Sequence, residues 1–233
     1  LAFRATISNG FHAPTLAQEY YSALAISPTA ARGLIGVNSP GALANGASPL
    51  KPERSTNVSG GIVMEPFRKL HVTVDVYQIN LRDQIMPGGQ VYGEQAKKAL
   101  QMNGFGLPGD VDTWSASSLS THWFANVAST RTQGLDLTAT YPTQLGDIGR
   151  IDWDVAINLN RTRLSHQGTD ADGNPLLNAQ SIAYPTTAYP LSKMTLVGRF
   201  TSRKRTAGVP VIRYGPPTSP LPYSRGAAQP HLL

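Results

Sequence analysis

The 233-residue sequence contains no cysteine, which excludes disulfide bonds, zinc-thiolate sites and thiol chemistry. It also lacks any apolar run near the roughly 18 to 20 residues that a membrane-spanning helix needs. If the chain crosses a bilayer, it must do so as part of a closed β-barrel, because a barrel satisfies its backbone hydrogen bonds there. The sequence opens on Leu1 without a starting methionine or a signal-like segment, so we expect any secretion signal to lie upstream.

Charge is sparse in this chain. Charged residues make up 15% of the sequence, and the formal net charge of +6 could suit nucleic acid or an anionic lipid. The basic residues are scattered, however, apart from Arg203, Lys204 and Arg205 in a turn-like stretch. We therefore expect no nucleic-acid partner. The 22 glycines and 18 prolines favour a β-protein rich in turns.

The clearest structural signal is an alternation of apolar and polar residues between positions 151 and 162. A period of two places the apolar groups on one face of a sheet and the polar groups on the other. This segment therefore predicts a strand with two chemically different faces. The apolar members are Ile151, Trp153, Val155, Ile157 and Leu159, and the polar members include Asp152, Asp154, Asn158 and Asn160.

Five further segments show the same alternation and predict strands of their own, and a sixth, poorer strand is expected over 207–214. A short turn at Gly146 joins one of them to the strand over 151–162 and makes a hairpin. In another, the apolar phase shifts from Val76 to Tyr77, which indicates either a bulge or a passage through an interface. The six segments span residues 3–7, 58–64, 70–81, 135–141, 194–200 and 207–214.

The connections between predicted strands alternate in length. Loops longer than about 15 residues are uncommon in compact domains. Short turns on one rim and long loops on the other are the layout of an outer-membrane barrel. The strand length also fits, because a tilted strand of about ten residues rises roughly 25 Å, which is the height of the apolar band on such a barrel. The short turns lie near Pro66, Gly146 and Arg203, and the long connections run from about Pro14 to Leu50, Pro87 to Ala125 and Ser165 to Pro190.

In such a barrel the polar face of each strand points into the lumen and the apolar face points to lipid. Charged residues on the polar face would form a solvated wall or salt bridges to an internal domain, and ligand contact is the alternative. Trp153 and Tyr141, near strand ends, are candidates for an interfacial aromatic girdle. The charged residues expected in the lumen are Arg4, Asp75, Asp136, Asp152, Asp154, Arg161 and Arg163.

One helix is expected over Gly93–Met102, inside the second long connection, with Asn103 and Gly104 as its C-cap. The glycines of Gly104–Gly109 match a dinucleotide-binding fingerprint. They follow a helix instead of a strand, and Pro108 interrupts them, so a loop is the better interpretation.

Metal and catalytic chemistry find little support in the sequence. Asp170, Asp172, Gly173 and Asn174 are similar to the start of a calcium loop, yet no glutamate closes it, and a turn explains these residues. The five histidines lack metal-ligand spacing, and no nucleophile elbow is present. We therefore expect no metal, no cofactor and no enzyme activity.

Four strings resemble motifs of TonB-dependent receptors. Residues 3–16 are similar to R-A-x-x-S-x-G-F-R-A-P-x-L, with His12 in place of the usual basic residue. Residues 50–55 are similar to L-K-P-E-x-S. Residues 75–85 are similar to D-x-Y-x-I-x-I-x-D-x-I, and 131–137 to R-T-x-G-h-D-h, where h is apolar. The strings follow one another in the order that the family shows.

The resemblance implies an all-β fold: an antiparallel transmembrane β-barrel fragment with about 7 strands of a roughly 22-stranded barrel. We expect residues 1–214 to form this partial barrel. Residues 215–233 are expected to be a Pro-rich irregular tail that is truncated or read in a shifted frame, because prolines at this density cannot form a ladder strand. The N-terminal plug domain and the TonB-contacting segment are expected outside this sequence.

The resemblance further implies a place in the bacterial outer membrane and active uptake of a scarce nutrient with energy from TonB. A ferric siderophore, cobalamin or a carbohydrate would be the substrate. The implied partners are outer-membrane lipid, the plug domain of the same protein, the TonB complex and the small nutrient ligand. A passive outer-membrane porin or adhesin-type barrel is the main alternative, and a soluble β-protein comes third.

Ligand contacts are expected on the long loops, where aromatic groups offer stacking area and flexibility costs the scaffold little. Trp123 and Phe124 fit rim or girdle positions better than ligand contacts. The bulky loop residues that strand burial explains least, and that are therefore predicted to contact ligand, are Tyr20, Tyr21, Tyr92 and Trp114.

Overall fold

The computed structural model describes residues 1–169, 173, 175–177, 179–187 and 189–216. Seven antiparallel strands follow one another in the order β1-β4-β5-β6-β7-β8-β9, and a β2–β3 hairpin joins the same sheet through β6. The strands are β1 (Ala2–His12), β2 (Ala23–Ser27), β3 (Ala30–Leu34), β4 (Glu53–Phe67), β5 (Leu70–Tyr92), β6 (Leu119–Gln144), β7 (Arg150–Gln167), β8 (Ser192–Thr201) and β9 (Thr206–Tyr214). The helices are α1 (Leu16–Tyr20), α2 (Pro40–Leu43), α3 (Gly93–Met102), η1 (Val111–Thr113), η2 (Ala116–Ser118) and α4 (Ala179–Thr186).

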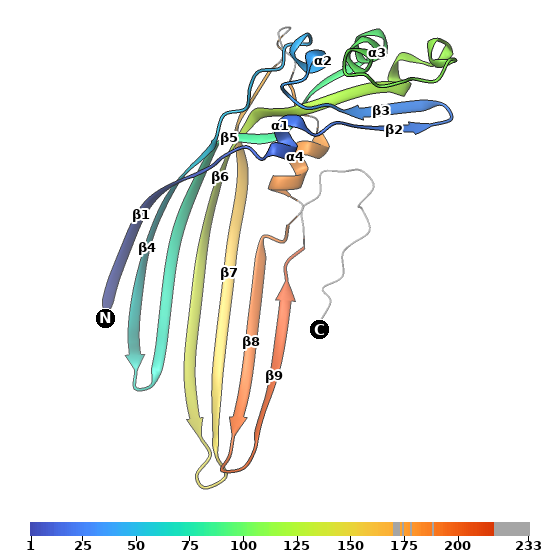
Figure 1. Cartoon of the computed structure of the whole chain (residues 1–233). Helices are drawn as coiled ribbons and strands as arrows, with labels where there is room; N and C mark the ends of the chain where they lie inside the picture. The colour runs from blue at the N-terminus through green and yellow to red at the C-terminus, as the bar shows by residue number, and fades with distance from the viewer. Residues whose placement is uncertain (170–172, 174, 178, 188, 217–233) are drawn as a thin grey trace.

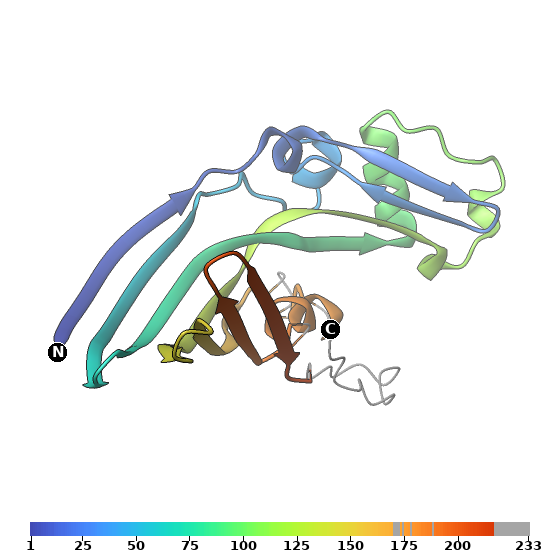
Figure 2. The ribbon, with the colours of Figure 1, turned by 90° about the horizontal axis from the view of Figure 1, so that it is seen from below.

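The seven-strand path is an open, curved sheet (Figures 1 and 2). β1 pairs only with β4 and β9 only with β8, so the described residues form a segment of wall with two free edges. Each of the seven segments predicted from alternation lies in one of these strands, which confirms the antiparallel barrel-fragment architecture. We call residues 2–12, 53–82, 128–167 and 192–214 the sheet wall.

The two faces of the sheet wall differ in chemistry, as the alternation predicts. Asp75 lies opposite Asp136, and Asp136 lies opposite Asn158, so these polar residues share one face. The apolar face is the more exposed of the two: Leu159 is 45% and Trp153 39% exposed. Exposed apolar groups beside half-buried carboxylates are the reverse of the distribution in a soluble domain.

The phase shift after Val76 is not a bulge. β5 stays in unbroken register with β6 from His71 to Leu81, and the irregularities begin only between Leu81 and Gln84. The apolar pattern changes because the residues that follow Val76 on its face, Gln78 and Asn80, are polar.

Two of the charged residues expected in the lumen lie on the other face. Arg161 and Arg163 follow Leu159 at intervals of two, so they share its face, opposite to that of Asn158. Both side chains are exposed. Their assignment to the polar face was wrong because the apolar stretch of β7 ends at Leu159, and polar groups then occupy both faces.

Connections of two kinds lie at opposite ends of the strands (Figure 1). Three short turns connect β4 to β5, β6 to β7 and β8 to β9, as predicted. In the first of them Lys69 takes the left-handed conformation, with φ 70°, and its N–H donates to Glu65 Oε1 over 2.9 Å. The helices and the β2–β3 hairpin gather at the other end (Figure 1).

The first two long connections pack into one body, the loop module, formed by residues 15–50 and 84–127. Its boundaries differ from the predicted loops, because β5 continues to Tyr92 and β6 begins already at Leu119. The β2–β3 hairpin was not predicted at all. β3 pairs with β6 in parallel, and Ile35 N–H donates to the His122 carbonyl oxygen over 3.0 Å.

The loop module contains an apolar core. Leu100 and Ile35 are fully buried there, and Trp123, expected at the rim, is only 5% exposed. By contrast, Ala128 is the one buried hydrophobic residue in the described part of the sheet wall. The buried members of the module's main cluster are Ala31, Ile35, Val37, Ala42, Ala96, Ala99, Leu100, Val111, Leu119 and Trp123.

Helix α3 has the predicted bounds, Gly93–Met102. Asn103 is its C-cap and Gly104 follows with φ 78°, the left-handed geometry that ends many helices. Ala99 and Leu100 on its buried face explain why this stretch is helical within a loop. No helix in the described parts of the chain is long and apolar enough to span a membrane.

Candidate functional site

A cavity of about 390 Å³ lies where the loop module meets the top of the sheet wall. All three long connections contribute to its lining: Pro49 comes from the first, Trp123 from the second, and Thr169 and Leu176 from the third. Lys51 and Asn126, which directly follow the first two connections, line it as well. The cavity therefore depends on segments far apart in the sequence. Its cation, amide and indole groups suit a polar ligand with a planar or apolar part.

Asn126 lines this cavity and forms hydrogen bonds with two other segments of the chain. Its Oδ1 accepts from the Lys51 N–H over 2.8 Å, and its Nδ2 donates to the carbonyl oxygens of Lys51 and Asp83 over 2.8 and 2.6 Å. Asp83 has φ 57°, a left-handed conformation within the irregular part of β5. One side chain thus joins the first long connection to β5 and β6.

Glu53 fixes the same region from the start of β4. Its Oε1 accepts from the Ile85 N–H over 2.7 Å, and its Oε2 lies 3.4 Å from His12 Nδ1. The carboxylate therefore satisfies a backbone donor where the β5 register is irregular. This gives the L-K-P-E-x-S string a structural role at the point where the chain re-enters the wall.

Trp123 reaches the cavity because the residue opposite it has no side chain. It pairs with Gly89 across β5 and β6, and a Cβ on Gly89 would lie 2.0 Å from its Cε2. The indole therefore lies over the glycine backbone, and only glycine fits there. Sequence reasoning missed Trp123, Asn126 and Lys51 as cavity residues, although the pairing of a glycine with an aromatic residue across two strands is a usable signal.

The four aromatic residues predicted to contact ligand are spread over the loop module and do not line this cavity. Tyr20, Tyr21 and Tyr92 are 64%, 57% and 52% exposed. Trp114 is half-buried against the apolar core, and its Nε1 lies 3.4 Å from Asp110 Oδ2. The three tyrosines are therefore open to solvent, whereas the Trp114 side chain packs partly against the apolar core of the loop module.

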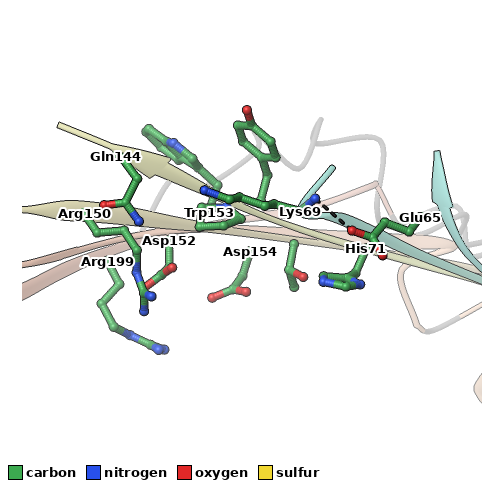
Figure 3. A pocket seen from close by; sticks show the side chains of 12 residues that line it. Glu65, Lys69, His71, Gln144, Arg150, Asp152, Trp153, Asp154 and Arg199 are labelled. Atoms are coloured by element: carbon green, nitrogen blue, oxygen red, sulfur yellow. Dashed lines mark hydrogen bonds and ion pairs between the residues drawn. The ribbon is translucent and has the colours of Figure 1, made fainter. Parts of the chain in front are cut away.

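A second cavity, of about 620 Å³, lies near the short-turn end of β5, β6 and β7. Figure 3 shows His71, Asp152, Asp154 and Arg199 extending to one side of the sheet, which is the polar face. Arg150 Nη2 lies 2.9 Å from Asp152 Oδ2. This surface of mixed charge suits a hydrated or protein-covered lumen better than a binding pocket for an apolar ligand.

Metal sites need a donor set of several side chains placed close together. The described residues contain no group of three or more histidine and carboxylate side chains placed to hold a metal ion. Gly104–Gly109 lies in the loop after α3, as expected. Asp170, Asp172 and Asn174, considered for calcium, lie outside the described residues.

Two groups in the loop module have shifted pKa values. Burial lowers the pKa of His122, and a hydrogen bond with the Gly33 backbone opposes that shift. The pKa of Lys97 is raised, first by its hydrogen bond to the Asp112 carboxylate. The Lys97–Asp112 ion pair links α3 to η1.

A family model described as TonB dependent receptor-like, beta-barrel, matches residues 1–225. Among solved structures, a mutant of the ferric enterobactin receptor PfeA from Pseudomonas aeruginosa is 17% identical, with a TM-score of 0.56 over 93% of this chain and 26% of that one. The siderophore receptor PirA from Acinetobacter baumannii is 15% identical, with a TM-score of 0.54 over 99% and 30%. The copper transporter OprC is 17% identical, with a TM-score of 0.52 over 93% and 24%.

These likenesses show the fold. The chain spans about a quarter to a third of the length of these matched structures. No curated protein matches the sequence.

Proposed function

Because the chain belongs to the TonB-dependent receptor β-barrel family, we propose that it forms part of the wall and extracellular loops of a receptor that takes up a scarce nutrient with energy from TonB. Barrels of this family are outer-membrane proteins of Gram-negative bacteria, and its members are transport receptors, not enzymes. We assign residues 1–214 to the barrel part. Of the Pro-rich tail expected over 215–233, residues 217–233 lie outside the described residues.

The observation that carries this proposal is the reversed distribution of polarity across the sheet wall. Val76 is 53%, Leu159 45% and Met194 41% exposed, all in strands with neighbours on both sides and all on the face that carries Ile157. Lipid would cover these groups, while water and the plug domain would cover the carboxylates on the other face. An unpaired charge on the lipid side of such a barrel costs about 2 to 4 kcal/mol, which explains the strict alternation.

We propose a metal chelate as the substrate class. The similar structures are described as a ferric enterobactin receptor, a siderophore receptor and a copper transporter, which supports a metal chelate ahead of cobalamin or a carbohydrate. We propose that the exposed Tyr20, Tyr21 and Tyr92 contact this ligand first. Trp114 contributes less, because its ring already packs against the module.

The family match disfavours a passive porin or adhesin-type barrel. A TonB-dependent receptor needs energy from TonB for uptake, whereas a passive porin does not. The test is growth of bacteria that depend on the intact receptor for a ferric siderophore, with and without a working TonB. Uptake that stops when TonB is removed supports the proposal. Equal uptake in both strains would show a passive pore.

The ligand contacts are tested in the same intact receptor. Replacing Tyr20, Tyr21 and Tyr92 together with alanine is expected to weaken ligand binding by about tenfold or more, since aromatic contacts contribute about 0.5 to 1.5 kcal/mol each beyond burial. Tyr189, 62% exposed on the third long connection, provides the matched control. Equal affinity in the triple variant and wild type would place recognition in the plug or in other loops.

A further inference from the structure

The apolar face of the sheet wall ends in a group of arginines toward the long-loop end. We call the five residues the arginine belt; all lie on the face of Leu159 and all are exposed. The belt consists of Arg54, Arg82, Arg131, Arg161 and Arg163.

The strand register places the belt on three successive rungs above the last apolar rung. That rung is the last one that is apolar in β5, β6 and β7, and it contains Val76, Leu135 and Leu159; in β1 and β4 the apolar residues continue one rung further, to Ile7 and Val58. Next comes Arg161, paired with Gln133; then Arg131, paired with Arg163; and then Arg54, paired with Arg82. Successive rungs are roughly 7 Å apart along the strands. The belt therefore begins at the edge of the apolar surface, with no gap between them.

The belt has no counter-charge of its own. None of its five arginines takes part in an ion pair within the described residues, and the rungs contain no acidic side chain. Arg131 Nε donates only to the neutral Asn80 Oδ1, over 3.1 Å. Arg54 faces Arg82, and Arg131 faces Arg163, directly across the ladder. Like charges in such positions destabilise a sheet unless an anion lies between them.

A cavity of about 550 Å³ accompanies one of these pairs. Arg54 and Arg82 line it together with Phe11, which is 80% exposed and pairs with Arg54 on the same face. The cavity thus offers two guanidinium groups for an anion and an aromatic ring for an apolar chain. Guanidinium groups bind phosphate oxygens through paired, charge-assisted hydrogen bonds.

We propose that the arginine belt binds the phosphate groups of membrane lipids in the leaflet on the long-loop side. The belt continues the apolar face, so a molecule whose acyl chains cover Val76 and Leu159 presents its headgroup at the level of the arginines. A phosphorylated lipid satisfies both surfaces at once, whereas a free anion would satisfy only the arginines. Lipid bound here holds the loop end of the wall at a fixed depth in the membrane. The inference rests on the proposed membrane insertion of the wall.

The test uses the intact receptor, purified in detergent, and native mass spectrometry of the lipid it retains. The probes are a bis-phosphorylated bacterial glycolipid, the same glycolipid after removal of its phosphates, and inorganic phosphate. The variants are Arg54→Gln with Arg82→Gln, and Arg131→Gln with Arg163→Gln. The control is Arg203→Gln with Arg205→Gln, which removes two exposed arginines at the short-turn end.

We expect the wild type and the control to prefer the phosphorylated glycolipid about tenfold or more, and each belt variant to lose most of this preference. Equal retention by wild type and belt variants would overturn the inference. So would an equal loss in the control, or complete displacement of the glycolipid by millimolar inorganic phosphate, which would indicate a site for free anions. Heat-modifiable migration of the wild type on gels is measured in parallel: its absence would refute the proposed barrel itself, whereas a normal shift with unchanged lipid retention refutes only the belt.

Discussion

The sheet wall and the loop module belong to one chain and share β5 and β6, yet they bury apolar surface in opposite ways. In the module, Leu100 and Ile35 are fully buried and Trp123 nearly so, as in any soluble domain. In the wall, side chains of the same kind, such as Val76 and Leu159, remain 53% and 45% exposed although their strands have neighbours on both sides. The difference fits the proposal that lipid covers the apolar face of the wall, whereas the module buries its apolar groups as a protein in water does.

The largest effect is expected from a charge on the apolar face of the wall. Ile157→Arg places a cation at a central position of β7 on that face, at a cost of about 2 to 4 kcal/mol, and should abolish assembly. The matched control is Asn158→Arg, the next residue on the opposite face, where Asp136 offers a carboxylate. Heat-modifiable migration of the intact receptor measures both. Similar loss in the two variants would remove the distinction between the faces.

A cavity in the loop module should produce the next largest effect, but a local one. Leu100→Ala removes a fully buried side chain and should destabilise the module by about 2 to 5 kcal/mol. Met102→Ala, at a 52% exposed position of the same helix, should change little. Hydrogen exchange is expected to accelerate in β2, β3 and α3 while β7 and β8 stay protected. Faster exchange throughout β7 and β8 would mean that wall and module unfold as one unit.

Asn126 joins the two regions, so its removal tests how firmly they are coupled. Asn126→Ala leaves the Lys51 N–H and the Asp83 carbonyl without this partner and should cost about 1 kcal/mol or somewhat more. Proteolysis of folded receptor should then cut faster near Lys51 than in the wild type. Asn45→Ala, whose amide donates to the Gly41 carbonyl oxygen inside the module, should leave that cleavage rate unchanged.

The smallest effect is expected from pH. Burial lowers the pKa of His122 in the folded module, so the unfolded chain binds more protons once the pH falls below about 6.5. The stability of the module should therefore decrease as the pH falls through that value and level off below the folded pKa. His122→Gln should remove this dependence. Hydrogen exchange of β3 at pH 7.5 and 5.5 measures this dependence in the wild type and the variant. If the variant kept the same pH response as the wild type, the effect would belong to another group.

Much of the wall could be predicted from sequence, because each strand has one apolar and one polar face with a period of two. The bounds of α3 were also predicted correctly, since Asn103 and Gly104 form a recognisable helix end. These features are local, and one stretch of sequence is enough to show them.

The features that were missed depend on partners distant in the chain or on counting residues along a strand. The β2–β3 hairpin lacks alternation, and its edge is satisfied by parallel pairing with Leu119 to His122. Trp123 is buried in a cluster with residues that are distant in sequence, such as Ala31 of β3 and Leu100 of α3. Arg161 and Arg163 were assigned by their charge, whereas counting from Leu159 in steps of two places them on the outer face.

The most direct test of the account is the environment of successive positions along β7. The chain has no native cysteine, so single cysteines can be introduced at residues 154–163 of the intact receptor and labelled with a nitroxide. In lipid vesicles, collisions with oxygen should be frequent at 155, 157 and 159, and collisions with a water-soluble nickel complex should dominate at 154, 156 and 158. At 161 and 163 the oxygen signal should fall, because these positions lie beyond the apolar band. Uniform exposure to water along β7, or the opposite phase, would contradict the account.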